Sequence, residues 1–158
     1  MTEQDKQFMT RAIELARAGM DKNDGGPFGC VVAKDGEIVG EGNNCVTSTN
    51  DPTAHAEVVA IRNACERLNA FQLDGCSIYT SCEPCPMCLG AIYWARPAQV
   101  FYACTREDAA AVGFDDDFIY NELALPNEAR KRVMVNLLRD EGVALFQAWE
   151  SKTDKVEY

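Results

Sequence analysis

The sequence has little histidine, no long apolar run and no excess of basic residues. A run of about 18 or more apolar residues, the signal of a membrane-spanning helix, does not occur. The first 20 residues mix charged and apolar positions and do not join a basic run to an apolar one, so we expect no signal peptide and no membrane span. The formal net charge is -10, from 25 acidic and 15 basic residues. This balance disfavours nucleic acid or another large polyanion as partner.

Cysteine, by contrast, is abundant, with eight residues in a chain of 158. A disulfide framework is typical of short secreted chains, and because nothing here marks export, we expect free thiols in a reducing cytoplasm. Five cysteines stand apart or in apolar runs, where a free cysteine usually behaves as a small buried apolar residue: Cys30, Cys45, Cys65, Cys76 and Cys104. The other three, Cys82, Cys85 and Cys88, crowd into "SCEPCPMC".

Hydrophobic spacing predicts one α/β domain over residues 1–158, without repeats. We expect a first helix that ends near Gly19, then a tight hairpin around Asp35-Gly36. A second helix is expected from about Ala54 to Leu68, capped by Asp51 or Thr53. A third helix opens beside Pro86. Further strands are expected at "CSIYTS" (76–81), "QVFYAC" (99–104) and "VMVNLL" (133–138), with a terminal helix at "VALFQAWES" (143–151).

Helices that alternate with strands after an opening hairpin indicate a mixed three-layer α/β/α domain, with helices on both faces of one sheet. In such a fold, polar groups at the ends of helices and strands can meet at one edge. The chemistry-bearing motifs of this sequence fall at two helix starts.

The only histidine, His55, stands two positions before Glu57 in "TAHAEVVAI". Residues two apart on a helix point to nearly opposite sides, so these two side chains can converge only at a helix end. The predicted helix places them there, where free N–H groups and the positive end of the helix dipole favour negative charge.

Cys85 and Cys88 lie three apart at the start of the next helix, so their sulfurs share a face. A C-x-x-C pair in a cytosolic chain is a strong metal signal, and His55 completes a set of three ligands for Zn²⁺. Two thiolates and one imidazole leave one tetrahedral position for water, whose pKa zinc lowers from 15.7 towards roughly 7. Glu57 is then well placed to take the proton of that water and pass it on.

Each feature also has a structural interpretation. His55 can be a hydrogen-bonded core residue, and a carboxylate in the first turn of a helix can serve only the dipole. The C-x-x-C pair can be redox-active, or Cys82 can supply a fourth ligand and make a structural zinc-binding module that holds no water. The joint occurrence of H-x-E and P-C-x-x-C favours catalysis, because this combination is typical of zinc-dependent nucleobase deaminases.

The chain resembles the cytidine and deoxycytidylate deaminase superfamily from the N-terminal helix through "FYAC", and within it the bacterial guanine deaminases. The closer resemblance rests on "GGPFG", "GNN", "NDPTAHAE", "YTSCEPCPMCLGAIYWAR", "GFDDDFIY" and the tail from "FQAW" to "EY". It implies a mixed five-stranded sheet, one zinc ion on His55, Cys85 and Cys88, and Glu57 as proton shuttle. It also implies hydrolysis of guanine to xanthine and ammonia in purine salvage or catabolism.

The same resemblance implies where a purine would bind. Asn44 offers an amide donor and acceptor, and the backbone N–H of Ala56 can bind a carbonyl. Phe28 and Trp94 can stack on a flat base, although both residue types also suit a core. An acidic group in "FDDDF" can accept guanine's ring N–H and amino protons, and motif position favours Asp116 over Asp115 and Asp117.

The tail predicts a lid. Residues of about 143–158 begin as a helix that must bury Leu145, Phe146 and Trp149, and they continue as a polar strip that ends in Tyr158. A docked helix with a free strip can close over a site and bring the Tyr158 hydroxyl or the terminal carboxylate to the purine. The family resemblance implies a homodimer in which this segment is exchanged between subunits.

Other substrates remain open at this point, namely tRNA adenosine, cytosine and further aminated heterocycles such as a triazine. Relatives that act on tRNA adenosine typically carry a basic C-terminal region, whereas this chain ends in "ESKTDKVEY". The acidic balance also argues against RNA, whose binding depends on lysine and arginine contacts to phosphate.

Overall fold

The computed structural model describes residues 1–114 and 116–158 and divides them into two compact units, Met1–Asp116 and Asp117–Tyr158. The first unit holds a four-stranded sheet in the order β2-β1-β3-β4. Its strands are β1 (Gly29–Lys34), β2 (Glu37–Asn43), β3 (Ser77–Cys82) and β4 (Gln99–Cys104). β1 is antiparallel to both β2 and β3, whereas β3 and β4 are parallel. The predicted α/β class is therefore confirmed for this unit.

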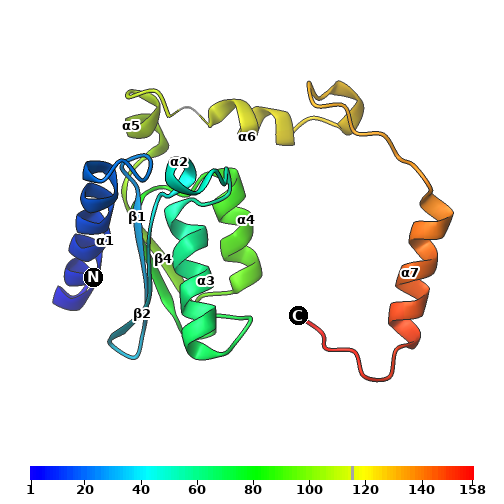
Figure 1. Ribbon diagram of the computed structural model, residues 1–158, viewed down its shortest axis with the longest axis horizontal. Helices are drawn as coiled ribbons and strands as arrows, with labels where there is room; N and C mark the ends of the chain where they lie inside the picture. Colours follow the sequence, from blue (N-terminus) through cyan, green and yellow to red (C-terminus); the bar gives the residue numbers. More distant parts are fainter. Residues whose placement is uncertain (115) are drawn as a thin grey trace. The chain divides into compact units, whose positions relative to one another are not determined.

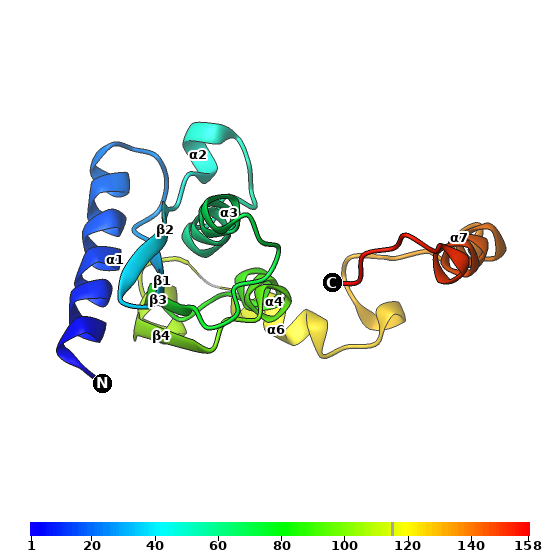
Figure 2. The same ribbon diagram turned by 90° about the horizontal axis from the view of Figure 1, so that it is seen from below.

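Helices cover both faces of this sheet, with α1 (Glu3–Asp21) on one side and α3 (Ala56–Leu68) and α4 (Pro86–Ala95) on the other (Figures 1 and 2). Alternate residues of β1 pack against α1 and against the α3–α4 layer, because successive side chains of a strand point to opposite faces. Val31 packs in the cluster under α1, whereas Val32 packs in the cluster under α3 and α4. β1 is thus buried on both faces, which explains its unbroken apolar run.

The hairpin between β1 and β2 turns at Asp35-Gly36, as predicted. Both residues have positive φ, 50° and 83°, which the tight two-residue turns of hairpins require. β2 then carries two glycines that let α3 approach the sheet. A Cβ atom on Gly42 would lie 2.5 Å from the carbonyl oxygen of Ala56, and one on Gly40 would lie 2.5 Å from that of Ala60. This close approach holds the first turn of α3, and with it Glu57, against the strands.

The predicted cap of α3 was wrong. The helix begins at Ala56 with His55 as its N-cap, and His55 makes no side-chain capping hydrogen bond. Asp51 instead accepts a hydrogen bond from the backbone N–H of Thr53 at 2.8 Å, which closes a local turn before the helix. The imidazole ring is therefore not engaged in capping its own helix and is directed towards the neighbouring helix.

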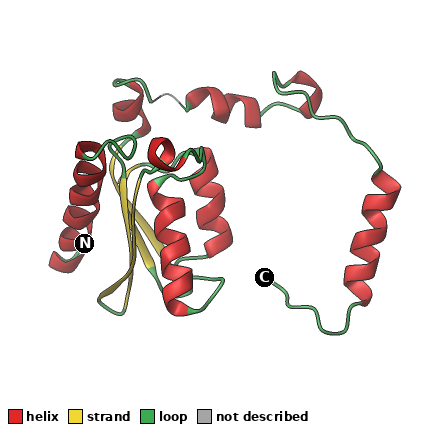
Figure 3. Ribbon diagram, in the orientation of Figure 1, coloured by secondary structure: helices red, strands yellow, loops and turns green. Residues whose placement is uncertain are grey.

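The predicted fifth strand was also wrong for the described residues. The segment 133–138 contains no strand or helix, and the sheet has four strands. An extended segment becomes a strand only when another strand completes its ladder of hydrogen bonds, and this segment has no such ladder. Shorter elements fill the rest of the chain (Figure 3): α2 (Val46–Thr49), α5 (Arg106–Ala110), α6 (Asp117–Leu123) and the 3₁₀ helix η1 (Asn127–Ala129).

The second unit ends in α7 (Arg139–Ser151), which confirms the predicted terminal helix and starts four residues earlier. Much of its apolar surface is open to solvent, including Leu145 and Phe146. Within residues 1–114 and 116–158, no helix combines the length and the apolar composition needed to cross a bilayer.

Candidate active site

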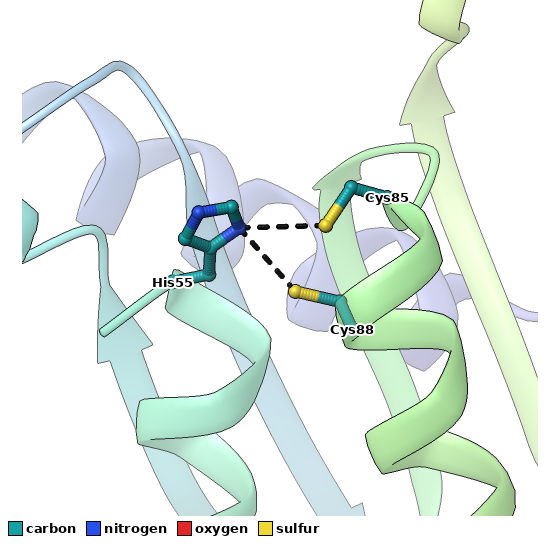
Figure 4. A group of neighbouring side chains, drawn as sticks. All are labelled: His55, Cys85 and Cys88. Carbon is teal, nitrogen blue, oxygen red and sulfur yellow. Dashed lines mark hydrogen bonds between the residues drawn. The ribbon is translucent and has the colours of Figure 1, made fainter. Parts of the chain in front are cut away.

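Three potential metal ligands converge between the starts of α3 and α4. His55 precedes the first residue of α3, Cys85 precedes the first residue of α4, and Cys88 lies in the first turn of α4. The Nδ1 atom of His55 lies 3.5 Å from the Sγ atom of each cysteine, and all three ligand atoms lie within 4.8 Å of one another (Figure 4). The C-x-x-C spacing places both sulfurs on the side of α4 that faces the histidine.

These distances suit zinc. Zinc bonds of about 2.3 Å to sulfur and about 2.0–2.1 Å to nitrogen, at a tetrahedral angle, separate the two atoms by roughly 3.5 Å. The observed separation between His55 Nδ1 and each sulfur is 3.5 Å. Two soft thiol groups and one imidazole are also the donor chemistry that zinc prefers. The residues present therefore fit the metal that the sequence predicts.

The mutual hydrogen bonds of His55, Cys85 and Cys88 favour ionisation of one of the two thiols, that of Cys85. Hydrogen bonds from the Cys88 thiol and from His55 lower the pKa of Cys85, although burial opposes this shift. The pKa of Cys88 is raised, because its proton is held by Cys85 and because its sulfur is buried near Glu57. The pKa of His55 is raised chiefly by its hydrogen bond with Cys85. One thiol is thus ready to ionise, as metal binding requires.

Glu57 lies at the inner wall of the same site. Its side chain is buried, and its Oε1 atom accepts a hydrogen bond from the Oγ1 atom of Thr80 at 3.2 Å. Burial raises the pKa of this carboxyl group. Among the residues that the structure describes, the metal-ligating group contains His55, Cys85 and Cys88 but not Glu57. The carboxyl group is therefore available for proton transfer.

A cavity of about 420 Å³ opens in front of these residues. This volume is within the range of small-molecule sites. Its walls come from the loop before β1, the segment after β2, the starts of α3 and α4, and the segment after β4. The lining residues are Gly26, Phe28, Asn44, Val46, Thr47, His55, Glu57, Cys82, Glu83, Cys85, Arg106, Ala109, Gly113, Phe114 and Asp116.

Three of the residues predicted to bind the substrate line this cavity: Phe28, Asn44 and Asp116. The Phe28 ring meets that of Phe114 edge to face, with centroids 4.9 Å apart and planes at 86°. Asn44 is buried, and its Oδ1 atom accepts a hydrogen bond from the backbone N–H of Val46 at 3.2 Å. This bond fixes the orientation of the amide at the cavity wall.

The other predicted substrate residues are placed differently. Ala56 is fully buried as the first residue of α3. Trp94 lies on α4 with 64% of its surface exposed and is not among the cavity-lining residues of the described chain. Tyr158 belongs to the second unit. Of the two alternatives to Asp116, Asp117 begins α6, and Asp115 lies outside the described residues.

Sequence reasoning missed several cavity residues, notably Phe114, Arg106 and Glu83. Phe114 stands in the quoted stretch "GFDDDFIY" beside the predicted Asp116, so its aromatic ring was the available signal. Arg106 and Glu83 are connected by a hydrogen bond from the backbone N–H of Arg106 to Glu83 Oε2 at 3.2 Å. Nothing in the local sequence indicated that these two residues face the same cavity.

Cys82 also lines the cavity but does not join the metal-ligating group of the described residues. Its Sγ atom lies 3.5 Å from the carbonyl oxygen of Thr105, and burial raises its pKa to about 11. Its sulfur is thus engaged with a backbone carbonyl group and lies apart from the three ligand atoms that gather within 4.8 Å of one another. This placement disfavours the four-ligand structural zinc site.

Comparison with known proteins agrees with this site. The family model for the cytidine and deoxycytidylate deaminase zinc-binding region matches residues 2–104. The guanine deaminase of Bacillus subtilis is 57% identical over 151 residues, which cover 96% of this chain and 97% of that protein. The X-ray structure of guanine deaminase from Bacillus subtilis matches with a TM-score of 0.95 at 55% identity, over 100% of this chain and 99% of that chain.

A further relative, the tRNA-specific adenosine deaminase of Aquifex aeolicus, is 40% identical over 96 residues, or 61% of this chain and 63% of that protein. The family match spans all three metal-ligating residues and Glu57. The chain therefore belongs to the zinc-binding cytidine and deoxycytidylate deaminase family.

Proposed function

We propose that this protein is a zinc-dependent guanine deaminase that hydrolyses guanine to xanthine and ammonia. The observation that carries the proposal is the convergence of His55, Cys85 and Cys88 beside a cavity that also contains the Glu57 carboxyl group. The choice of guanine is supported by the 57% identity to the Bacillus subtilis guanine deaminase, which extends over 96% of the chain.

His55, Cys85 and Cys88 hold the metal in this proposal. Zinc bound there supplies a Lewis acid that activates water near neutral pH. Glu57 takes the proton of that water, delivers it to the ring nitrogen next to the amino-bearing carbon, and then assists the departure of ammonia with a second proton. The balance is guanine plus water to xanthine plus ammonia. The buried position of Glu57 keeps bulk water from competing for these protons.

The remaining cavity residues orient the base. Phe28 and Phe114 form an aromatic wall on which a flat purine can stack. Asn44 and the backbone N–H of Ala56 bind guanine's acceptor groups, and Asp116 accepts protons from the ring N–H and the 2-amino group. Stacking by Trp94 remains a prediction. It requires a substrate-binding segment, for example one from a second subunit, to lie against the exposed face of α4.

The protein functions as a homodimer in this account, and residues 1–158 act as one catalytic domain. β4 is the edge strand of the four-stranded sheet, and all the apolar residues of the segment 133–138 are exposed, namely Val133, Met134, Val135, Leu137 and Leu138. A contiguous run of exposed apolar residues marks a surface that another chain can cover. Residues of about 143–158 of a second copy then cover the site of its neighbour.

A location in the cytoplasm is part of the same proposal. It is supported by eight cysteines that are all free thiols, including the exposed Cys104. Free thiols of this number suit a reducing compartment.

One experiment separates guanine from the other substrates. The purified full-length protein is incubated with guanine, adenine, cytosine, guanosine and ammeline separately, and ammonia release is measured with and without a metal chelator. We expect chelator-sensitive release from guanine at the highest rate. Release from adenine or cytosine and not from guanine would contradict the proposal.

A further inference from the structure

One buried hydroxyl group touches the proposed proton shuttle. Thr80 lies on β3 with 1% of its surface exposed, and its Oγ1 atom lies 3.2 Å from Oε1 of Glu57. On the same face of the strand, two residues earlier, Ile78 is fully buried in the apolar cluster under α3 and α4. Thr80 therefore places a polar group where the strand otherwise carries apolar ones.

A buried hydroxyl group needs a partner. Burying a hydroxyl group without a hydrogen bond costs free energy, because its hydrogen bonds with water are lost and not replaced. Valine has nearly the same shape as threonine and carries no hydroxyl group, so its burial has no such cost. The partner of this hydroxyl is a carboxylate oxygen, and a hydrogen bond to a charged acceptor is stronger than one between neutral groups. The value of threonine at this position thus lies in its contact with Glu57.

We propose that Thr80 is a positioning residue that fixes the orientation of the Glu57 carboxylate for proton transfer. The inference depends on the proposed role of Glu57 as proton shuttle. Because the hydroxyl of Thr80 occupies Oε1, the other oxygen, Oε2, is the one that exchanges protons with water and the base.

The two residues are held by different layers of the fold. Thr80 is paired with Cys30 on β1 and with Tyr102 on β4, so its backbone is fixed on both sides by the sheet. Its β-branched side chain has few χ1 rotamers, which makes the hydroxyl a rigid donor. The last torsion of a glutamate side chain, in contrast, is broad. The fixed Thr80 hydroxyl group on the sheet therefore restricts the last side-chain torsion of Glu57.

Four variants of the zinc-loaded full chain test this inference: Thr80→Val and Thr80→Ala lack the hydroxyl, Thr80→Ser keeps it, and Ile78→Val is the matched control. Ile78→Val removes one methylene from the same face of the same strand and leaves the Thr80–Glu57 contact in place. For each variant we would measure kcat and KM for guanine, zinc per chain, melting temperature and, by calorimetry, the affinity for xanthine.

We expect Thr80→Val and Thr80→Ala to lower kcat about 10- to 100-fold, the range for a misplaced catalytic group. Their KM, zinc content and xanthine affinity should stay within about twofold, since substrate binding does not require proton transfer. Thr80→Ser should recover most of kcat. Ile78→Val should lower the melting temperature and leave kcat unchanged. In a Glu57→Gln background, Thr80→Val should cause no further loss, because Thr80 acts only through Glu57.

The inference is overturned if zinc-loaded Thr80→Val turns over guanine within about threefold of the parent, or if Thr80→Ser is as impaired as Thr80→Ala. An additional loss in the Glu57→Gln background would also contradict it. All these outcomes are measured relative to a parent protein that deaminates guanine. If the parent itself releases no ammonia from guanine, the proposed function is wrong, and the role of Thr80 is wrong with it.

Discussion

His55 and Glu57 come together at the end of one helix. Two residues this close in sequence cannot share a lateral face of a helix. In the structure His55 is the N-cap residue and Glu57 lies in the first turn, and both line the same cavity. The N-cap backbone is extended, with φ -71° and ψ 154°, which lets the imidazole turn away from the helix towards Cys85 and Cys88.

Replacing Glu57 with glutamine tests its role as a proton shuttle. The amide keeps the size of the side chain but cannot accept the proton, so guanine turnover should fall by at least about 10² to 10⁴. Zinc content and melting temperature should stay near those of the parent. The control is Glu66→Gln, an exposed position on the same helix, which should leave turnover unchanged. Turnover by Glu57→Gln within about tenfold of the parent would contradict the role of Glu57 as proton shuttle.

The substitution Asp116→Asn tests how guanine is distinguished from other bases. An amide presents donors where the carboxylate presents only acceptors, so kcat/KM for guanine should fall at least about tenfold, the loss expected for one hydrogen bond to a charged group. Zinc binding and melting temperature should not change. Asp117→Asn is the matched control, because Asp117 accepts a hydrogen bond from Asn121 within α6. A larger defect for Asp117→Asn or Asp115→Asn would reassign this role.

Four residues of the site were predictable from sequence as one group, because their spacing within two short motifs brings them to two helix starts: His55, Glu57, Cys85 and Cys88. Arg106 and Glu83 were not, because they meet only where the loop after β3 returns beside the end of β4. Trp94 lies on α4 with 64% of its surface exposed, so its role in stacking stays a prediction. Local pattern identifies a functional group, whereas the direction in which it points depends on distant packing.

At the scale of secondary structure, α1, α3, α4, α7 and the four strands followed from hydrophobic period and turn residues, whereas the short helices α2, α5 and α6 did not. The segment 133–138 has the pattern of a strand but forms none in the structure, because β-structure is completed by a partner that sequence does not specify. The Asp51 cap failed for a different reason. A short polar side chain near a helix start can close a turn upstream instead of capping the helix, and the two outcomes compete.

The contact between α1 and β3 contains a hydrogen bond that should make stability depend on alkaline pH. The Tyr79 hydroxyl donates to Asp5 Oδ1 at 2.8 Å, and burial together with this bond raises the pKa of Tyr79 to about 12. The pKa of an unfolded tyrosine is about 10. The contribution of this hydrogen bond to the free energy of unfolding is therefore fully present below about pH 10, and it is lost as the pH rises from about 10 to about 12.

The variant Tyr79→Phe isolates this effect. Urea unfolding at each pH should show a constant difference in the free energy of unfolding between parent and variant from pH 7 to 9. Above that range the difference should shift in favour of the variant. Tyr93→Phe, at an exposed position on α4, controls for ionisation of surface tyrosines. If the difference in the free energy of unfolding stays constant up to pH 12, the pKa of the Tyr79 hydroxyl is the same in the folded and the unfolded protein, which contradicts the prediction.

At the scale of the whole molecule, the net charge of -10 and the extent of similarity point to a small substrate. The match to the tRNA-specific adenosine deaminase covers 61% of the chain, whereas the match to the guanine deaminase covers 96%. The C-terminal region lies beyond residues 2–104, which the family model matches. It is also the region whose role sequence alone predicted as a lid.

Deleting the residues after Lys152 tests that role. The truncated protein should bind one zinc per chain and keep its melting temperature, but it should lose most guanine turnover, since an open site admits water to the intermediate. A variant with the same six positions changed to glycine and serine controls for chain length. Full turnover in a folded, zinc-loaded truncation would show that the tail is not part of the site.

The central claim is that zinc held by His55, Cys85 and Cys88 makes this protein a guanine deaminase. The most direct measurement is a titration of the metal-free protein with zinc, in which conversion of guanine to xanthine is followed at each zinc-to-chain ratio. We predict that the rate rises linearly, reaches its plateau at one zinc per chain, and does not rise in a Cys88→Ala variant. Full turnover without zinc, or a zinc-saturated parent protein that leaves guanine unchanged, would contradict the account.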